Sequence, residues 1–198
     1  MKNEKLADKP VLNMNPEHRS RLRDILKAKS YKEGTFVLAS GKTSDFYIDC
    51  RPSALDAEGS YLIGKLFYQM LEQLSFEVKG VGGMTLGADP LSTATSLISF
   101  IESNPLPAFI VRKEAKGHGT KQWMEGRSNF EEGDTVVILE DVVTTGGSSI
   151  KAIERVRESG LKIGAVFALV DRLEGGREAI EKEGLPLHCL FDRTDFVS

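Results

Sequence analysis

Residues 135–148 read TVVILEDVVTTGGS, and this stretch decides the fold. The continuous apolar run from Thr135 to Leu139 is typical of a strand buried on both faces, as in a parallel sheet. Two acidic residues, hydroxyl residues and glycines follow, and then a helical pattern from about Ser148 to Ser159. A buried strand, a polar glycine-rich turn and a helix in this order predict one unit of an α/β fold.

The same alternation extends along the chain on both sides of this stretch. Helices are expected at about 15–29, 56–75, 90–103 and 176–182, and strands at 78–81, 108–112, 163–170 and 187–191. A hairpin is expected from 35–38 and 45–49, turned by Ser40-Gly41-Lys42, whereas 113–130 has no period. The pattern predicts an α/β fold, with a mostly parallel central sheet flanked by helices. Ligands of such sheets bind beyond the carboxyl ends of the strands.

The organisation is expected to be a single domain of 198 residues with three parts. Residues 1–14 are a polar arm, about 15–55 form a small N-terminal hood of one helix and the hairpin, and about 56–198 form the α/β core. Asn15 and Pro16 give the hood helix an N-cap and a first-turn proline.

Composition excludes several classes of protein. The chain has 26 basic and 29 acidic residues, a net charge of −3, so we expect no nucleic-acid partner. No apolar run approaches the ~20 residues that a membrane span needs, and the N-terminus lacks the apolar stretch of a signal peptide. Two cysteines, Cys50 and Cys189, are too few for a disulfide framework. We therefore expect a cytoplasmic protein with no membrane partner.

The acidic pair Glu140-Asp141 and the turn after it have a joint chemical use. A helix N-terminus offers unpaired N–H groups and a positive dipole end to a phosphate. Carboxylates beside a phosphate are useful if they hold ribose hydroxyls and the developing positive charge of a sugar carbon. They are also useful if they hold a metal that bridges to a second phosphate. The alternative is that this stretch is an acidic strand end followed by an ordinary N-cap, with no ligand. The phosphate loop is of neither common type, since the sequence contains no GxxxxGK[ST] and no GxGxxG.

A second constellation is RKEAKGHG at 112–119, which brings three cations and a histidine into one short segment. A solvated basic loop is the bland alternative. Because the remainder of the chain is acidic, we interpret the segment as a local anion site that stabilises a leaving pyrophosphate.

The 135–148 stretch resembles the phosphoribosyl-pyrophosphate-binding motif of the type I phosphoribosyltransferases. The 112–119 segment is similar to the flexible loop of orotate phosphoribosyltransferases, as is SGKTSDFY at 40–47 to that family's hood. Val170-Asp171-Arg172 matches the site of an arginine that holds the orotate carboxylate. The resemblance covers roughly residues 35–195.

The resemblance implies a type I phosphoribosyltransferase fold and a homodimer with shared active sites, in which part of the basic segment acts in the partner's site. It implies transfer of ribose 5-phosphate from 5-phosphoribosyl 1-pyrophosphate to N1 of orotate, with Mg²⁺ held mainly by substrate oxygens and water. Orotidine 5'-phosphate and pyrophosphate are the products, as in pyrimidine (UMP) biosynthesis. A purine phosphoribosyltransferase and a phosphoribosyltransferase-like RNA-binding regulator are the alternatives.

The implied site residues fall into three groups. Those with a catalytic role are Lys113, Lys116, His118 and Asp141. Those that bind phosphoribosyl pyrophosphate are Arg112, Lys113, Lys116, His118, Glu140, Asp141, Val142, Val143, Thr144, Thr145, Gly146, Gly147 and Ser148. Those that bind orotate are Thr144, Arg172, Phe46 and Tyr47, although the two aromatics also suit a hairpin core.

The sequence departs from the family pattern at three positions. Leu86 and Ala39 stand where some members carry lysines, and the first acidic residue of the pair is Glu140 rather than aspartate. No lysine for pyrophosphate is therefore assigned to the 82–90 turn, where backbone N–H groups remain available.

Overall fold

The computed structural model describes residues 13–37, 43–114 and 123–197. In this part of the chain a central sheet has six strands in the order β5-β4-β3-β6-β7-β8. The strands are β3 (Gly80–Met84), β4 (Ala108–Val111), β5 (Met124–Glu125), β6 (Thr135–Val143), β7 (Lys162–Asp171) and β8 (Leu187–Asp192). All neighbours pair in parallel except β5, which runs antiparallel to β4 at the edge. The predicted mostly parallel α/β sheet is confirmed.

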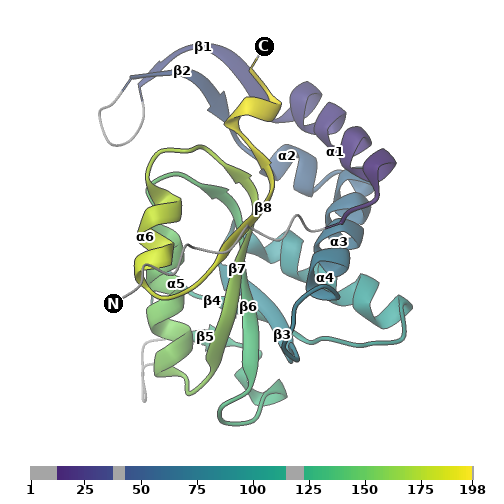
Figure 1. The fold of residues 1–198 in the computed structure, drawn as a ribbon, viewed down its shortest axis with the longest axis vertical. Coiled ribbons are helices and arrows are strands. Elements are labelled where there is room, and N and C mark those ends of the chain that lie inside the picture. Colours follow the sequence, from purple (N-terminus) through teal and green to yellow (C-terminus); the bar gives the residue numbers. More distant parts are fainter. Residues whose placement is uncertain (1–12, 38–42, 115–122, 198) are drawn as a thin grey trace, which may run out of the picture.

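Helices cover both faces of this sheet (Figure 1). The helices α5 and α6 lie on one face, and α1 to α4 lie on the other. Their bounds are α1 (Pro16–Lys29), α2 (Arg51–Ala54), α3 (Ala57–Leu71), α4 (Ala88–Ile101), α5 (Gly147–Glu158) and α6 (Gly176–Lys182), with 3-10 turns η1 (Arg127–Asn129) and η2 (Arg193–Asp195).

Strand β6 explains why both faces must be covered. Val136 and Ile138 pack into the core under α5 and α6, whereas Val137 and Leu139 pack into the core under α1 and α3. Successive side chains of a strand point to opposite faces, so this alternation sets the direction of the next two side chains. It breaks after them, since Val142 packs on the α1 and α3 side and Val143 packs on the α5 and α6 side. Glu140 is expected on the α5 side and Asp141 on the opposite side.

The N-terminal hairpin consists of β1 (Tyr31–Val37) and β2 (Thr43–Ile48), which pair antiparallel. Figure 1 shows it on the side of the molecule where the loops after β6 and β7 lie. Tyr31 stacks on Phe196 at 5.7 Å between ring centroids, which joins the hairpin to the last turn of the chain. As predicted, α1 begins at Pro16, and the Asn15 side chain accepts from the backbone N–H of Glu17 and His18.

Several expected boundaries were wrong. Strand β3 was expected at 78–81 with a turn at Gly82-Gly83, but these glycines are paired within the strand because Gly82 has partners on both sides, in β4 and β6. Strand β6 was expected to end at Leu139, but it pairs with β7 as far as Val143.

Other segments were missed or lie outside the described residues. The short helix α2 was not expected, nor was the edge strand β5 in the segment without a period. Strand β1 starts at Tyr31 rather than at 35, because Tyr31 packs on the core and pairs with Ile48. The turn at 40–42 and residues 1–12 of the polar arm lie outside the described residues. Within the described residues, no helix has both the length and the apolar character that a membrane crossing requires.

Candidate active site

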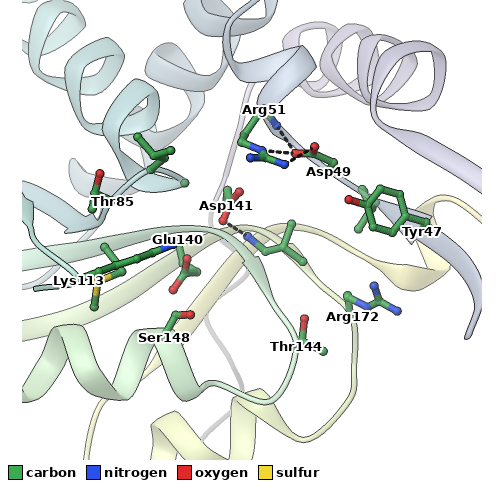
Figure 2. A pocket seen from close by; sticks show the side chains of 15 residues that line it. Tyr47, Asp49, Arg51, Thr85, Lys113, Glu140, Asp141, Thr144, Ser148 and Arg172 are labelled. Carbon is green, nitrogen blue, oxygen red and sulfur yellow. Dashed lines mark hydrogen bonds and ion pairs between the residues drawn. The ribbon is translucent and has the colours of Figure 1, made fainter. Parts of the chain in front are cut away.

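An open cavity of about 320 Å³ lies beyond the carboxyl ends of β3, β6 and β7, under the N-terminal hairpin (Figure 2). Residues from five separate parts of the chain meet there. The lining residues are Tyr47, Ile48, Asp49, Arg51, Met84, Thr85, Leu86, Gly87, Lys113, Glu140, Asp141, Val142, Thr144, Ser148 and Arg172. This is the edge of the sheet at which α/β proteins bind ligands.

The acidic pair enters this cavity from both faces of β6. Glu140 is buried on the α5 side, where the Ser149 hydroxyl donates to its Oε2 at 2.9 Å. Asp141 projects to the other side, toward Asp49 and Arg51 in Figure 2, and its Oδ1 accepts from the backbone N–H of Val142 at 2.9 Å. The two carboxyl groups therefore leave opposite faces of the strand, yet they remain close enough that the charge of Asp141 acts on Glu140.

Both carboxyl groups have raised pKa values, although each accepts a hydrogen bond. Burial raises the pKa of Glu140 to about 8, and the charge of Asp141 adds to this effect. Burial also raises the pKa of Asp141. No cation of the described residues is among the main causes of either shift. A ligand that brings hydroxyl donors or a cation would favour the ionised form of both groups.

Gly87 is required for the position of Asp141. A Cβ atom at Gly87 would lie 2.4 Å from Asp141 Oδ1, closer than any side chain allows. The turn that leads from β3 into α4 thus leaves room for the carboxylate. In the same turn, Thr85 Oγ1 donates to Asp89 Oδ2 at 2.7 Å.

The residues that follow the acidic pair form an anion site, the phosphate turn (residues 144–148). Gly146 has a φ of +81° and precedes the first residue of α5. No side chain among the described residues caps this helix end, so its first N–H groups point outward without intrahelical partners. The turn lines a second cavity of about 320 Å³, together with Glu140, Val142, Val143, Ser149 and Lys151.

The first two residues of the basic segment (112–119) differ in whether their side chains reach the cavity. Lys113 lines the cavity, whereas the Arg112 side chain is not among its lining groups and its Nη1 donates to Glu125 Oε1 at 2.7 Å. Lys116 and His118 lie outside the described residues. Of the two predicted cations that the structure describes, Lys113 is at this cavity and Arg112 is not among its lining residues.

The two predicted aromatic residues, Phe46 and Tyr47, also differ in position, because neighbouring side chains of a strand point to opposite faces. Phe46 is 1% exposed and does not line the cavity, and its ring lies against the guanidinium groups of Arg172 and Arg193 at 4.4 and 5.0 Å. Tyr47 is 38% exposed and lines the cavity. Arg172 also lines it, and its Nε donates to Glu174 Oε1 at 2.8 Å.

Sequence reasoning missed an ion pair in the cavity wall. Arg51 Nε and Nη2 donate to the two oxygens of Asp49 at 2.8 and 2.7 Å. These hydrogen bonds lower the pKa of Asp49 and raise the pKa of Arg51. We call Asp49, Arg51 and Lys113 the charged wall; the first two were missed because they follow the hairpin in sequence without a recognised pattern.

Further lining residues were missed, among them Thr85, Ser149 and Lys151. Lys151 is three residues after Ser148, which places both on one face of a helix, so its spacing was a usable signal. Leu86 is 64% exposed and lines the cavity, and Ala39 lies outside the described residues.

Two observations bear on whether these side chains could hold a divalent cation. Among the described residues no cluster of three His, Cys, Asp or Glu side chains is arranged to hold a metal ion. The raised pKa values of Glu140 and Asp141 nevertheless mark carboxylates that lack a cationic partner. Mg²⁺ commonly keeps several waters and binds through one or two carboxylates plus substrate oxygens. The acidic pair fits that mode.

Comparisons with known proteins agree with this arrangement. Residues 63–186 match the model of the phosphoribosyl transferase domain family. The chain is 48% identical over 182 residues to the orotate phosphoribosyltransferase of Aquifex aeolicus, an alignment that covers 90% of this chain and 97% of that protein.

Solved structures give the same result. The orotate phosphoribosyltransferase of Mycobacterium tuberculosis, crystallised with Fe(III) dicitrate, superposes with a TM-score of 0.78 and 36% identity over 91% of this chain and 99% of that one. Its complex with 5-phospho-α-D-ribosyl 1-diphosphate superposes with a TM-score of 0.73 and 31% identity, and covers 93% and 94% of the two chains. The chain belongs to the phosphoribosyltransferase family and, within it, to the orotate phosphoribosyltransferases.

Proposed function

We propose that this chain transfers ribose 5-phosphate from 5-phosphoribosyl 1-pyrophosphate, the donor, to N1 of orotate, and so forms orotidine 5'-phosphate and pyrophosphate. One observation carries the proposal: an acidic pair with raised pKa values and an uncapped helix N-terminus line two cavities that share the lining residues Glu140, Val142, Thr144 and Ser148. This arrangement suits a ligand that carries hydroxyls next to a phosphate.

The donor's 5-phosphate binds at the phosphate turn. The first N–H groups of α5, the hydroxyls of Thr144, Thr145 and Ser148, and the ammonium of Lys151 are the donors there. The M. tuberculosis relative crystallised with this donor molecule supports the assignment.

The donor's diphosphate lies toward the charged wall. Among the described residues, Lys113, Arg51 and Arg172 bring positive charge to this cavity. The Asp49 carboxylate orients Arg51 by accepting two hydrogen bonds from one edge of its guanidinium. The Nη1 group is then directed to a ligand. Arg51 supplies positive charge in a wall where Leu86 replaces the lysine of some relatives.

The acidic pair acts on the sugar. Asp141 and Glu140 accept hydrogen bonds from the ribose hydroxyls and stabilise the positive charge that develops on C1 as its bond to pyrophosphate breaks. When bound, Mg²⁺ neutralises part of the diphosphate charge; Asp141 and Glu140 are the residues that would hold it, together with donor oxygens and water.

Orotate binds between the hairpin and the loop after β7. The Tyr47 ring covers the flat base, and Thr144 and Arg172 face it from the loops after β6 and β7. The Arg172 guanidinium pairs with the orotate carboxylate. Purine bases carry no carboxylate, so this arginine supports orotate as the acceptor.

The transfer itself needs no strong base in the protein. Orotate that binds as the N1 anion has already lost its proton to solvent, and its nitrogen lone pair forms the new N1–C1 bond. The electron pair of the broken C1–O bond leaves with pyrophosphate, whose charge Lys113 and Arg51 stabilise. The cavity keeps water away from the cationic sugar carbon C1.

The enzyme acts as a homodimer with shared sites. Leu97, Phe100 and Ile101 form an exposed apolar face on α4, with Phe100 70% exposed. Such a face is typical of an interaction surface. Arg112 does not line its own cavity and binds Glu125 instead, which supports a role in the partner's site.

The enzyme works in the cytoplasm. Cys50 and Cys189 both carry free thiols, which supports a reducing compartment.

The test is an absorbance assay of orotate consumption with and without the donor and Mg²⁺, in which adenine, guanine and hypoxanthine compete. We expect consumption that requires both, no competition by purines, and loss of about 99% of turnover in Asp141→Asn because charge stabilisation is removed. Purine consumption instead, or donor-independent RNA binding that falls with salt, would replace the proposal by one of the two alternative functions.

A further inference from the structure

Arg155 of α5 holds the point where the basic segment leaves the sheet. Its Nη1 donates to the backbone carbonyl of Arg112, and its Nη2 donates to the carbonyl of Lys113 at 3.0 Å. The guanidinium carbon lies 4.1 Å from the centroid of the Trp123 ring. One side chain therefore contacts the backbone at residues 112–113 and the ring of Trp123.

The backbone closes the same junction. The N–H of Arg112 donates to the carbonyl of Trp123 at 2.8 Å, directly beyond the β4–β5 pair in which Val111 faces Met124. Strand β5 has only two residues. On its other side β4 pairs with β3 only as far as Val111, so beyond Val111 the Arg112–Trp123 hydrogen bond and the contacts of Arg155 hold the backbone at Lys113.

Arginine suits this position for a geometric reason. Its planar guanidinium donates in two directions in its plane while its face stacks on an indole. A lysine ammonium at the same place can donate to a carbonyl but has no flat face for the ring.

The same helix also organises the phosphate turn. Helix α5 begins at Gly147, and Arg155 is eight residues further, about 12 Å along the axis. Between them, Ser149 donates to Glu140. Helix α5 thus connects the phosphate turn, one carboxyl of the acidic pair and the backbone that carries Lys113.

We propose that Arg155 is a positioning residue, which places the Lys113 ammonium in the cavity by holding the backbone carbonyls of Arg112 and Lys113. The proposal rests on the function proposed above, because it assigns Lys113 to the donor's diphosphate. Arg155 itself does not line the cavity among the described residues.

The test compares Arg155→Gln with Arg157→Gln on the same helix. Arg157 also makes two hydrogen bonds, to Glu183 Oε2 at 2.8 Å and to the Glu183 carbonyl at 2.9 Å, and neither residue lines either cavity. We expect Arg155→Gln to lower kcat/KM for the donor about tenfold while KM for orotate is unchanged, because Lys113 is misplaced. Arg157→Gln should keep kcat/KM near the wild-type value at a similar melting temperature.

Two further measurements separate positioning from general damage. In a Lys113→Ala background, Arg155→Gln should produce little further loss, since the group that it positions is gone. Trp123 is the single tryptophan of the chain, so its fluorescence should change in Arg155→Gln and not in Arg157→Gln.

The proposal fails if Arg155→Gln and Arg157→Gln behave alike, or if the Arg155→Gln loss is undiminished in the Lys113→Ala background. If the wild-type enzyme does not consume orotate, the proposed function fails instead, and tryptophan fluorescence still decides whether Arg155 holds the segment.

Discussion

The two walls of the cavity are held in place by different forces. The phosphate turn is shaped by backbone: Gly146 adopts a φ of +81° and packs on Gly176, and α5 starts directly after it. The charged wall is held by side chains, with Arg51 bound by Asp49 and the Lys113 backbone bound by Arg155. Backbone amides keep their direction at every pH and salt concentration, whereas exposed ion pairs weaken with salt. We therefore infer that the phosphate turn determines where the donor binds, and that the charged wall determines how strongly its diphosphate is bound.

The largest effect is expected from Gly146→Ala, which alters the backbone-built wall. A Cβ at Gly146 would lie 3.1 Å from the Gly176 carbonyl oxygen, and the positive φ disfavours any side chain. Because the N–H groups at the start of α5 then shift, kcat/KM for the donor should fall about a hundredfold.

Gly133→Ala is the matched control, since Gly133 has a φ of +83° and only the end of Lys162 near its Cβ position. Each variant should lose about 1–3 kcal/mol of unfolding free energy, but Gly133→Ala should keep its kinetics. Equal kinetic losses in the two variants would show that strain, and not the position of the turn, matters.

A smaller effect is expected from Arg51→Gln in the charged wall. KM for the donor and for pyrophosphate in the reverse reaction should rise about tenfold, as one charge-assisted hydrogen bond is lost. The rise should shrink as salt is added, and KM for orotate should not change. Arg21 forms the same bidentate pair with Glu58 on the surface, so Arg21→Gln is the control; unchanged donor KM in Arg51→Gln would remove Arg51 from the site.

The smallest effect is the pH dependence caused by Glu140. Burial raises its pKa from 4.5 to about 8, so the folded chain binds this proton more tightly than the unfolded chain. Its contribution to stability is therefore complete below about pH 4.5 and is lost as the pH rises toward 8. Melting temperatures of the free enzyme should fall over this range, with a smaller slope in Glu140→Gln.

Glu154→Gln, which changes an exposed glutamate of α5, should keep the wild-type slope. An equal slope in Glu140→Gln and wild type would mean that Glu140 is ionised in the free enzyme.

The phosphate turn could be predicted because its information is local. The apolar run before Glu140 and the glycines after Thr145 encode strand, turn and helix within 135–148. The exact end of β6 could not be predicted, because Glu140 remains in the strand through its pairing with Ala168 of β7, a contact distant in sequence. The strand's alternation then separates Glu140 from Asp141, which the sequence presents as one pair.

The charged wall could not be predicted because its parts are distant in sequence. Arg51 of α2 and Lys113 after β4 line one cavity only when these elements are assembled, and α5 must then place Arg155 at the Lys113 carbonyl. Phe46 and Tyr47 show the same limit: both suit an aromatic contact to a base, but tertiary packing buries Phe46 under Arg172. Expectations for Lys116 and His118 stay predictions.

A crystal structure of the enzyme with the donor and Mg²⁺ tests the central claim most directly. The 5-phosphate oxygens should lie about 3 Å from the backbone nitrogens of Gly147 and Ser148, with the ribose hydroxyls at Glu140 and Asp141 and the diphosphate toward Lys113 and Arg51. A donor whose phosphate lies away from residues 144–148, or whose ribose is turned away from the acidic pair, would contradict the account.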